Sequence, residues 1–216
     1  SHTHLPEKNK FSKGSPEHGD YLADTLENIV TLHDASTIAS VIVEPIAGST
    51  GVLPPPKNYL KRLREICDKH DILLIFDEVI TGFGRLGKAT ASEYFGVTPD
   101  IISCAKAITN GIIPMGAAVV SKNIYDTMMD EADMPIELFH GYTYSGHPIA
   151  SAAGLAALDI YRDEDLFNKA GKTAKYLESV IHQLKNDKNV IDIRNLGLVA
   201  AIEIAPRPGA AGARGY

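Results

Sequence analysis

The stretch that most constrains this 216-residue chain is an unbroken apolar run that ends abruptly in two acids. Residues 72–79 read ILLIFDEV, a pattern typical of a strand buried on both faces of a parallel sheet. Open α/β sheets bind their ligands at the carboxyl ends of their strands. We therefore expect Asp77 to lie at a functional edge of a sheet.

A second strand-like run, residues 101–105, ends in the same way on Lys106 and is followed by a loop. If both strands belong to one parallel sheet, Asp77 and Lys106 emerge at the same edge. Each residue alone has a plainer explanation, because Asp77 could cap a turn and most lysines are solvated surface charges. After so apolar a run, however, we do not expect Lys106 to be freely solvated. A carboxylate and an amine in one crevice suggest chemistry.

Composition limits the classes of protein to which the chain can belong. With 44% hydrophobic and 22% charged residues, it is globular material, enough for one domain or one domain plus part of another. Its net charge of -6 argues against nucleic-acid binding, and it has neither a long apolar membrane span nor a signal segment. Cys67 and Cys104 fit ordinary buried thiols rather than a disulfide or a metal site. A reducing, cytoplasmic setting is the expectation.

Hydrophobic periodicity predicts a strand, helix, strand unit ahead of the acidic strand. Asp20 is a plausible N-cap for a first helix, and a strand at 38–43 is followed by an amphipathic helix from Tyr59 to Cys67. Such a crossover predicts a parallel strand pair. Residues 1–19 carry no sustained period and are predicted to be a surface connection. Later elements are predicted as an apolar run at 115–121, helices at 123–129, 150–158 and 166–184, and strands at 190–193 and 198–204.

The glycine-rich loop after the acidic strand allows a rival interpretation. Residues 82–88 satisfy the first seven positions of the phosphate loop G-x-x-x-x-G-K, and the strand before them resembles a Walker B strand. Ala89 stands where magnesium binding needs Ser or Thr, and this loop follows the acidic strand instead of opening the domain. A nucleotide hydrolase is therefore the weaker alternative.

One cofactor needs a lysine and a carboxylate together. Pyridoxal phosphate is held by a lysine Schiff base, and a carboxylate keeps its pyridine nitrogen protonated so that the ring can accept electrons. Lys106 as a free amine could also carry the proton between substrate and cofactor carbons. The remaining anchor is a phosphate site of backbone amides and hydroxyls, and residues 141–146, GYTYSG, have the composition for part of one.

The order and spacing of four motifs resemble the class III pyridoxal-phosphate aminotransferases. Within that family the chain is most similar to the ω-amino acid (β-alanine) to pyruvate aminotransferases. The resemblance covers about residues 20–208. The motifs are VEPIAG at 43–48, FDEVITGFGR at 76–85, AKA at 105–107 and GYTYSGHP at 141–148.

The resemblance implies a fold-type I transferase of the α/β class, with a mainly parallel central sheet flanked by helices and the start of a smaller α+β C-terminal domain. Residues 1–161 would be the C-terminal portion of the large cofactor-binding domain, and 162–216 the incomplete beginning of the small one. Lys106 matches the Schiff-base lysine, Asp77 the partner of the pyridine nitrogen, and Val79 the side chain packed on the ring. Further matches are Tyr142 and Thr143, which reach the cofactor phosphate of the neighbouring subunit, and Glu44, an acid near the site.

The implied activity is transamination from an ω-amino acid or related amine to pyruvate or another keto acid, in a homodimer or a dimer-based tetramer. Family members are considerably longer, and the parts that complete the substrate pocket fall outside this sequence. The chain is therefore either an excerpt of a longer protein or one that has lost most of that pocket. Alternatives remain a diamine aminotransferase, an aminomutase, the nucleotide hydrolase above, and a non-catalytic fragment.

Overall fold

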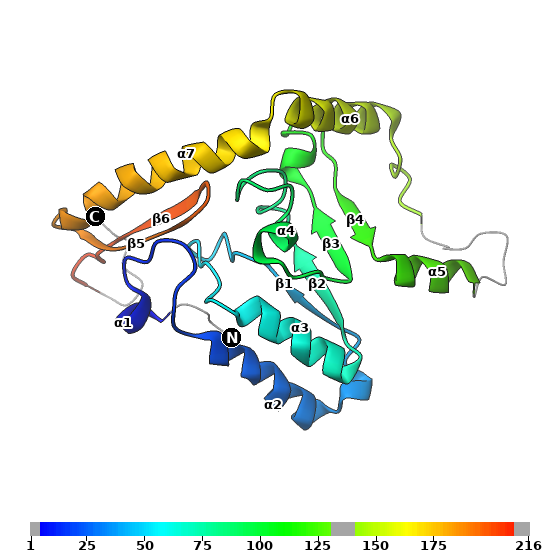
Figure 1. Cartoon of the computed structure of the whole chain (residues 1–216), viewed down its shortest axis with the longest axis horizontal. Coiled ribbons are helices and arrows are strands. Elements are labelled where there is room, and N and C mark those ends of the chain that lie inside the picture. Colours follow the sequence, from blue (N-terminus) through cyan, green and yellow to red (C-terminus); the bar gives the residue numbers. More distant parts are fainter. Residues whose placement is uncertain (1–4, 131–140, 210–216) are drawn as a thin grey trace.

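The centre of the computed structural model, which describes residues 5–130 and 141–209, is a four-stranded sheet in the order β1-β2-β3-β4 (Figure 1). Strands β1 (Ser40–Val43), β2 (Leu73–Asp77) and β3 (Ile101–Cys104) are parallel, and β4 (Ala117–Val120) pairs antiparallel with β3. The predicted mainly parallel α/β sheet is confirmed. Strand β2 ends at Asp77, so Glu78 and Val79 of the 72–79 stretch lie beyond the strand.

Helices cover one face of this sheet. The helices are α2 (Asp24–His33), α3 (Tyr59–His70) and the short α4 (Ala91–Phe95). The register places Val41 beside Leu74 and Val43 beside Phe76, so these four side chains share the covered face. Leu74 and Phe76 are fully buried there against Leu63 and other apolar residues of α3. This is the main hydrophobic core.

The opposite face of the sheet is open among the described residues. Ile42 is 63% exposed and Leu73 is 37% exposed, so the expectation that β2 is buried on both faces is wrong for this chain. The reason is that the core formed with α2 and α3 takes only every second residue of β1 and β2. Asp77 belongs, by alternation with Leu73, to the open face.

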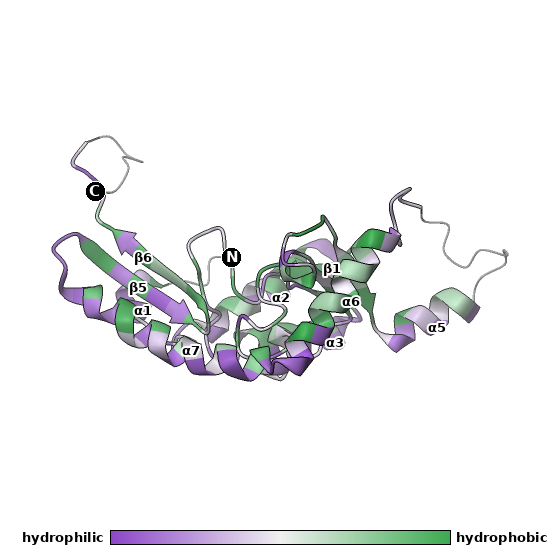
Figure 2. Ribbon diagram, turned by 90° about the horizontal axis from the view of Figure 1, so that it is seen from above, coloured by the Kyte–Doolittle hydropathy of each residue, from purple (hydrophilic) through white to green (hydrophobic). Residues whose placement is uncertain are grey.

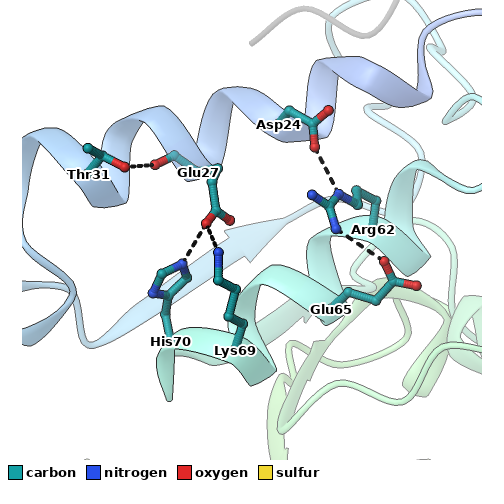
Figure 3. A network of polar contacts seen from close by, with 7 residues as sticks. All are labelled: Asp24, Glu27, Thr31, Arg62, Glu65, Lys69 and His70. Atoms are coloured by element: carbon teal, nitrogen blue, oxygen red, sulfur yellow. Dashed lines mark hydrogen bonds and ion pairs between the residues drawn. The ribbon is translucent and has the colours of Figure 1, made fainter.

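A seam of ion pairs aligns α2 with α3 (Figure 3). Glu27 on α2 accepts hydrogen bonds from Lys69 and from His70 Nε2 (2.9 Å), while Arg62 Nε binds Asp24 at 2.8 Å. The hydrogen bond from Lys69, and then that from His70, hold the pKa of Glu27 below its ordinary value. Exposed pairs of this kind contribute little stability, so the apolar core holds these helices together and the seam sets their alignment.

The C-terminal elements lie along the other side of the molecule. Helices α6 (Pro148–Asp163) and α7 (Leu166–Ile181) follow one another. The two-stranded sheet of β5 (Val190–Leu196) and β6 (Val199–Ile204) packs beside α7 (Figure 1). Hydrophilic and hydrophobic residues interleave along α7, as in an amphipathic helix (Figure 2). None of the described helices is both long and apolar enough to cross a membrane. Among the residues that the structure describes, one more helix, α5 (Lys122–Asp130), lies between β4 and α6.

The described part of the N-terminal segment is more than a surface connection. It contains α1 (Pro6–Asn9), and it bonds to β5 through Phe11 N to Asp192 Oδ1 (2.5 Å) and Gly14 N to the Asn195 carbonyl (2.8 Å). Pairing between residues 181 positions apart has no local pattern that could predict it. Asp20 is also not an N-cap, because it is the first residue of a 3-10 helix, Asp20–Ala23, and makes no capping bond. The other 3-10 helices are Ala35–Thr37, Lys106–Ile108 and His182–Asn186.

Candidate functional site

Three adjacent parallel strands bring the predicted site residues to one edge of the sheet. Val43 lies opposite Phe76, so Glu44 leaves β1 level with Asp77 at the end of β2. Lys106 follows two residues after the end of β3, the parallel neighbour of β2. The parallel pairing behind the predicted shared edge is thus confirmed, and the order along the edge is Glu44, Asp77, Lys106.

Asp77 is half-buried and keeps part of its carboxylate available. Its Oδ1 accepts a hydrogen bond from the Val79 amide at 3.1 Å, which turns the chain away from the sheet. The other oxygen, Oδ2, receives no hydrogen bond from any residue that the structure describes. Asp77 can therefore accept a further N–H on the open side of the sheet.

Lys106 is exposed, contrary to the expectation that it is shielded from solvent. The covered strand ends at Cys104, so the lysine lies beyond it, at the start of the 3-10 turn Lys106–Ile108. Its φ of 47° is left-handed, a conformation that costs about 1–3 kcal/mol for a residue with a side chain. Within 5–130 and 141–209, no ion pair or hydrogen bond engages the Lys106 amine. A strained backbone presents an amine at the open edge.

Glu78, the second acid, has a structural role that the sequence analysis did not predict. It is buried, and its carboxylate accepts bonds from the amides of Ala91 (2.5 Å) and Ser92 (2.9 Å) and from the Thr81 hydroxyl (3.3 Å). A carboxylate at the N-terminal end of α4 satisfies its unpaired N–H groups. Glu78 therefore fixes the chain just after Asp77, while Asp77 itself stays on the open face.

Glu44 begins a loop that is held from both ends. Its Oε2 accepts the Gly48 amide at 2.9 Å. Further along the loop, the buried Arg194 of β5 donates to the Gly51 carbonyl at 2.9 Å and is ion-paired with Glu203 at 2.7 Å. The second sheet thereby fixes the loop that carries Glu44 away from β1.

The glycine-rich loop at 81–87 is a packing element. A Cβ added to Gly87 would lie 2.9 Å from the Gly171 Cα of α7, and one on Gly84 would lie 3.0 Å from the Phe167 ring. A Cβ on Gly197, in the β5-β6 turn, would lie 2.4 Å from a carbonyl oxygen of the loop. These glycines let α7 and the second sheet approach the loop closely. This packing explains the glycine spacing of the loop without a role in phosphate binding.

The predicted phosphate-binding pair lies on an exposed turn. Tyr142 and Thr143 are both exposed, and the turn closes through Ser145 N to the Tyr142 carbonyl at 2.9 Å. No described polar contact joins Thr143 to Asp77 or Lys106. Service to a neighbouring subunit stays a prediction.

Two hollows flank the edge without enclosing it. One, of about 420 Å³, lies between α2 and β1 and is lined in part by Glu44. The other, of about 190 Å³, lies between the glycine-rich loop and the α6-α7 junction and is lined in part by Tyr161. Neither is lined by Asp77 or Lys106. The described residues contain no cluster of His, Cys, Asp or Glu that could hold a metal ion.

Comparison with known proteins decides the family. The family model described as "Aminotransferase class-III" matches residues 2–211. The chain belongs to the class III aminotransferases. Membership confirms the motif resemblance, and it removes the support for a nucleotide hydrolase.

Curated relatives within the family are similar over nearly the whole chain. An omega-aminotransferase of Caulobacter vibrioides is 64% identical over 99% of this chain and 48% of its own length. A beta-alanine–pyruvate aminotransferase of Pseudomonas aeruginosa is 57% identical over 92% of this chain and 45% of its own. The chain thus spans about half the length of these relatives.

Solved structures agree with the fold. An omega-transaminase from Thermomicrobium roseum superposes with a TM-score of 0.81 and 40% identity, over 85% of this chain and 40% of that one. A structure described as a transaminase with L-ala gives 0.85 at 33% identity, over 94% of this chain and 48% of that one. The neighbours are transaminases, and the shared fold confirms the predicted fold-type I α/β class.

Proposed function

We propose that this chain carries the catalytic centre of a pyridoxal-phosphate-dependent transaminase. The reaction moves an amino group from an ω-amino acid or related amine to pyruvate or another keto acid. The observation that carries the proposal is the placement of Asp77 and Lys106 at the ends of adjacent parallel strands. Relatives named for omega-amino acids, beta-alanine and pyruvate support the choice of substrates.

The residues present suit pyridoxal phosphate. Asp77 has an oxygen on the open face that can accept the pyridine N–H, and the Lys106 amine is exposed at the same edge without a described ion pair. Both requirements of the cofactor, an amine for the covalent link and a carboxylate for the ring nitrogen, are thereby met. Val79, half-buried beside Asp77, would pack on the ring, and Glu44 would lie near the site.

When bound, pyridoxal phosphate supplies an electron sink for the C–H bond that is broken in the substrate. Asp77 would keep the ring nitrogen protonated. A carboxylate that accepts a hydrogen bond from the pyridine N–H stabilises the protonated, cationic ring. Lys106 would hold the cofactor covalently at rest. Once released, its Nζ would take and return the substrate proton.

The assembly and the division of the chain are also part of the proposal. Residues 1–161 would belong to the large cofactor-binding domain and 162–216 to the beginning of the small one. In a homodimer or a dimer-based tetramer, Tyr142 and Thr143 would reach the cofactor phosphate of the neighbouring subunit. Their exposed turn, which ends at the N-terminal end of α6, supports a role outside their own subunit.

The proposed function is tested by locating the covalent link. Borohydride reduction of the full-length protein with pyridoxal phosphate, followed by peptide mass mapping, should place the pyridoxyl adduct on Lys106. The exposed Lys88 and Lys122 are internal controls, since neither follows a strand of the central sheet that ends at the shared edge. An adduct on either one in place of Lys106 would contradict the proposal. Visible spectra before and after adding ω-amino acids or diamines would then separate the substrate classes.

A further inference from the structure

Tyr161, near the end of α6, lies beneath the turn that presents Lys106. It is 8% exposed, and its hydroxyl donates to the Ala107 carbonyl at 2.5 Å and lies 3.1 Å from Asn110 Oδ1. Ala107 directly follows Lys106, and Asn110 ends the same turn. A side chain 54 residues away therefore holds both ends of the segment that carries the amine.

This turn needs external support. Lys106 has a φ of 47° and Asn110 a φ of 51°, so residues with side chains occupy the left-handed region at both ends. Such conformations persist only when surrounding contacts over-determine them. One such contact is the buried Thr109, whose hydroxyl donates to the Ile113 carbonyl at 2.7 Å. Tyr161 supplies a contact from outside the turn, at the residue next to Lys106.

The ring of Tyr161 is itself fixed by two other elements. It stacks on Phe83 of the glycine-rich loop, with ring centroids 5.9 Å apart, and on Phe167 of α7, with centroids 5.4 Å apart. Contact with two stacked rings restricts the Tyr161 ring, and the direction of the hydroxyl is restricted with it. The position of α7 is thus connected to the Lys106 turn through a single side chain.

We propose that Tyr161 is a positioning residue for Lys106. Its hydroxyl sets the turn that places the amine, and its stacked ring ties that turn to the glycine-rich loop and to α7. The proposal rests on the proposed function of Lys106. It predicts that loss of the hydroxyl alone impairs the steps in which Lys106 acts, because small displacements of a catalytic group are costly to rate.

The test uses the full-length holoenzyme with Tyr161→Phe, which keeps the ring stack and removes the hydroxyl. The turnover number should fall about ten- to hundredfold. The KM for the amine should change less than about twofold, because substrate binding is untouched. The pH midpoint of the visible band of the Lys106-linked cofactor should also move. Tyr176→Phe, a tyrosine 70% exposed on α7, is the matched control and should leave all three quantities unchanged.

The outcomes separate this inference from the proposed function. If borohydride fails to link the cofactor to Lys106 in the wild-type protein, the proposed function fails. If that link forms and Tyr161→Phe keeps the wild-type turnover and pH midpoint, the positioning role is overturned. A third variant, Phe167→Leu, keeps the hydroxyl and removes one stacked ring. If the loss of turnover in the three variants simply follows their loss of melting temperature, Tyr161 has only a structural role, and this result also overturns the proposal.

Discussion

Asp77 and Glu78 are adjacent acids with opposite environments, because successive side chains of a strand point to opposite faces. Asp77 keeps the open face of β2 and has a single described hydrogen bond. Glu78 turns inward and accepts hydrogen bonds from two backbone amides of α4. The buried Glu78 carboxylate, held by backbone donors, suits a structural role. The Asp77 carboxylate has an oxygen without a described donor and is suited to bind a ligand.

The substitution Asp77→Asn should keep the cofactor but lose most of the turnover. An amide cannot hold the pyridine nitrogen in its charged form, and we expect a loss of about 100-fold, or ~2.7 kcal/mol of barrier. Steady-state rates and the visible spectrum of the full-length variant measure the two effects. Asp126→Asn, on the outside of α5, is the control and should be silent. Wild-type rates in the Asp77 variant would make that acid merely structural.

Local pattern predicted the residues at the strand ends but not the residues that hold them. Asp77 and Lys106 follow apolar runs, which is a signal within a few positions of sequence. Ala91, whose amide binds Glu78, lies 13 residues after it. Ala107, whose carbonyl accepts from Tyr161, lies 54 residues before it. Those pairs exist only once α4 and α6 are packed. The exposure of Lys106 was missed for a different reason, because strand burial does not extend past the end of β3 at Cys104.

At the scale of elements, the glycine-rich loop joins the parallel sheet to the C-terminal elements. Leu198 N donates to the Arg85 carbonyl at 2.7 Å, so the β5-β6 turn is bonded directly to this loop. Gly197 precedes that bond and has a φ of 61°. Contact at this distance leaves no room for a side chain. The spacing of glycines that resembles a phosphate loop therefore reflects backbone packing.

We predict that Gly197→Ala destabilises the protein more than Gly96→Ala. Both glycines are left-handed, with φ of 61° and 64°, but only at Gly197 would the new Cβ meet backbone, at 2.4 Å. Gly96→Ala should cost ~1 kcal/mol for its conformation alone. Gly197→Ala should cost about 1–3 kcal/mol more, because overpacking against backbone adds to that strain. Urea unfolding of the two variants measures the difference, and equal losses would refute the packing role of this contact.

Periodicity predicted the type and order of the main elements but not their partners. The runs that became β1, β2 and β3 and the amphipathic pattern of α3 are local signals, and the structure contains all four. The antiparallel direction of β4 has no local signal, since only the chain path after the Lys106 turn determines it. The bonds of the N-terminal segment to β5 are likewise absent from any local period.

At the scale of the whole molecule, one side of α6 packs on the segment after Lys106 and the other side is exposed. The small residues Gly154 and Ala157 are not available for an interface, because a Cβ on Gly154 would lie 3.3 Å from Met115 Sδ and Ala157 is buried. The exposed side instead carries Ile149 and Leu155, which are 66% and 65% exposed. Large exposed apolar side chains next to the Thr143 turn favour an interface there.

The whole-molecule prediction is that Thr143 serves the cofactor of the other subunit. A full-length Thr143→Ala protein and a Lys106→Ala protein should each be impaired alone, and mixing them should restore activity in a fraction of dimers. If Thr143 acts across the interface, one site of a mixed dimer carries both defects and the other carries neither. If Thr143 acts within its own subunit, every site carries one defect.

Subunit exchange must be confirmed independently, for example by separating differently tagged chains after mixing. A control mixture of Lys106→Ala with Lys106→Ala/Thr143→Ala should stay inactive, because no site in it has an intact lysine. Recovery only in the first mixture would place the exposed turn of one chain at the edge formed by Asp77 and Lys106 of the other. Absence of recovery, with exchange confirmed and both parent variants impaired, would exclude the shared site and leave the exposed side of α6 without this role.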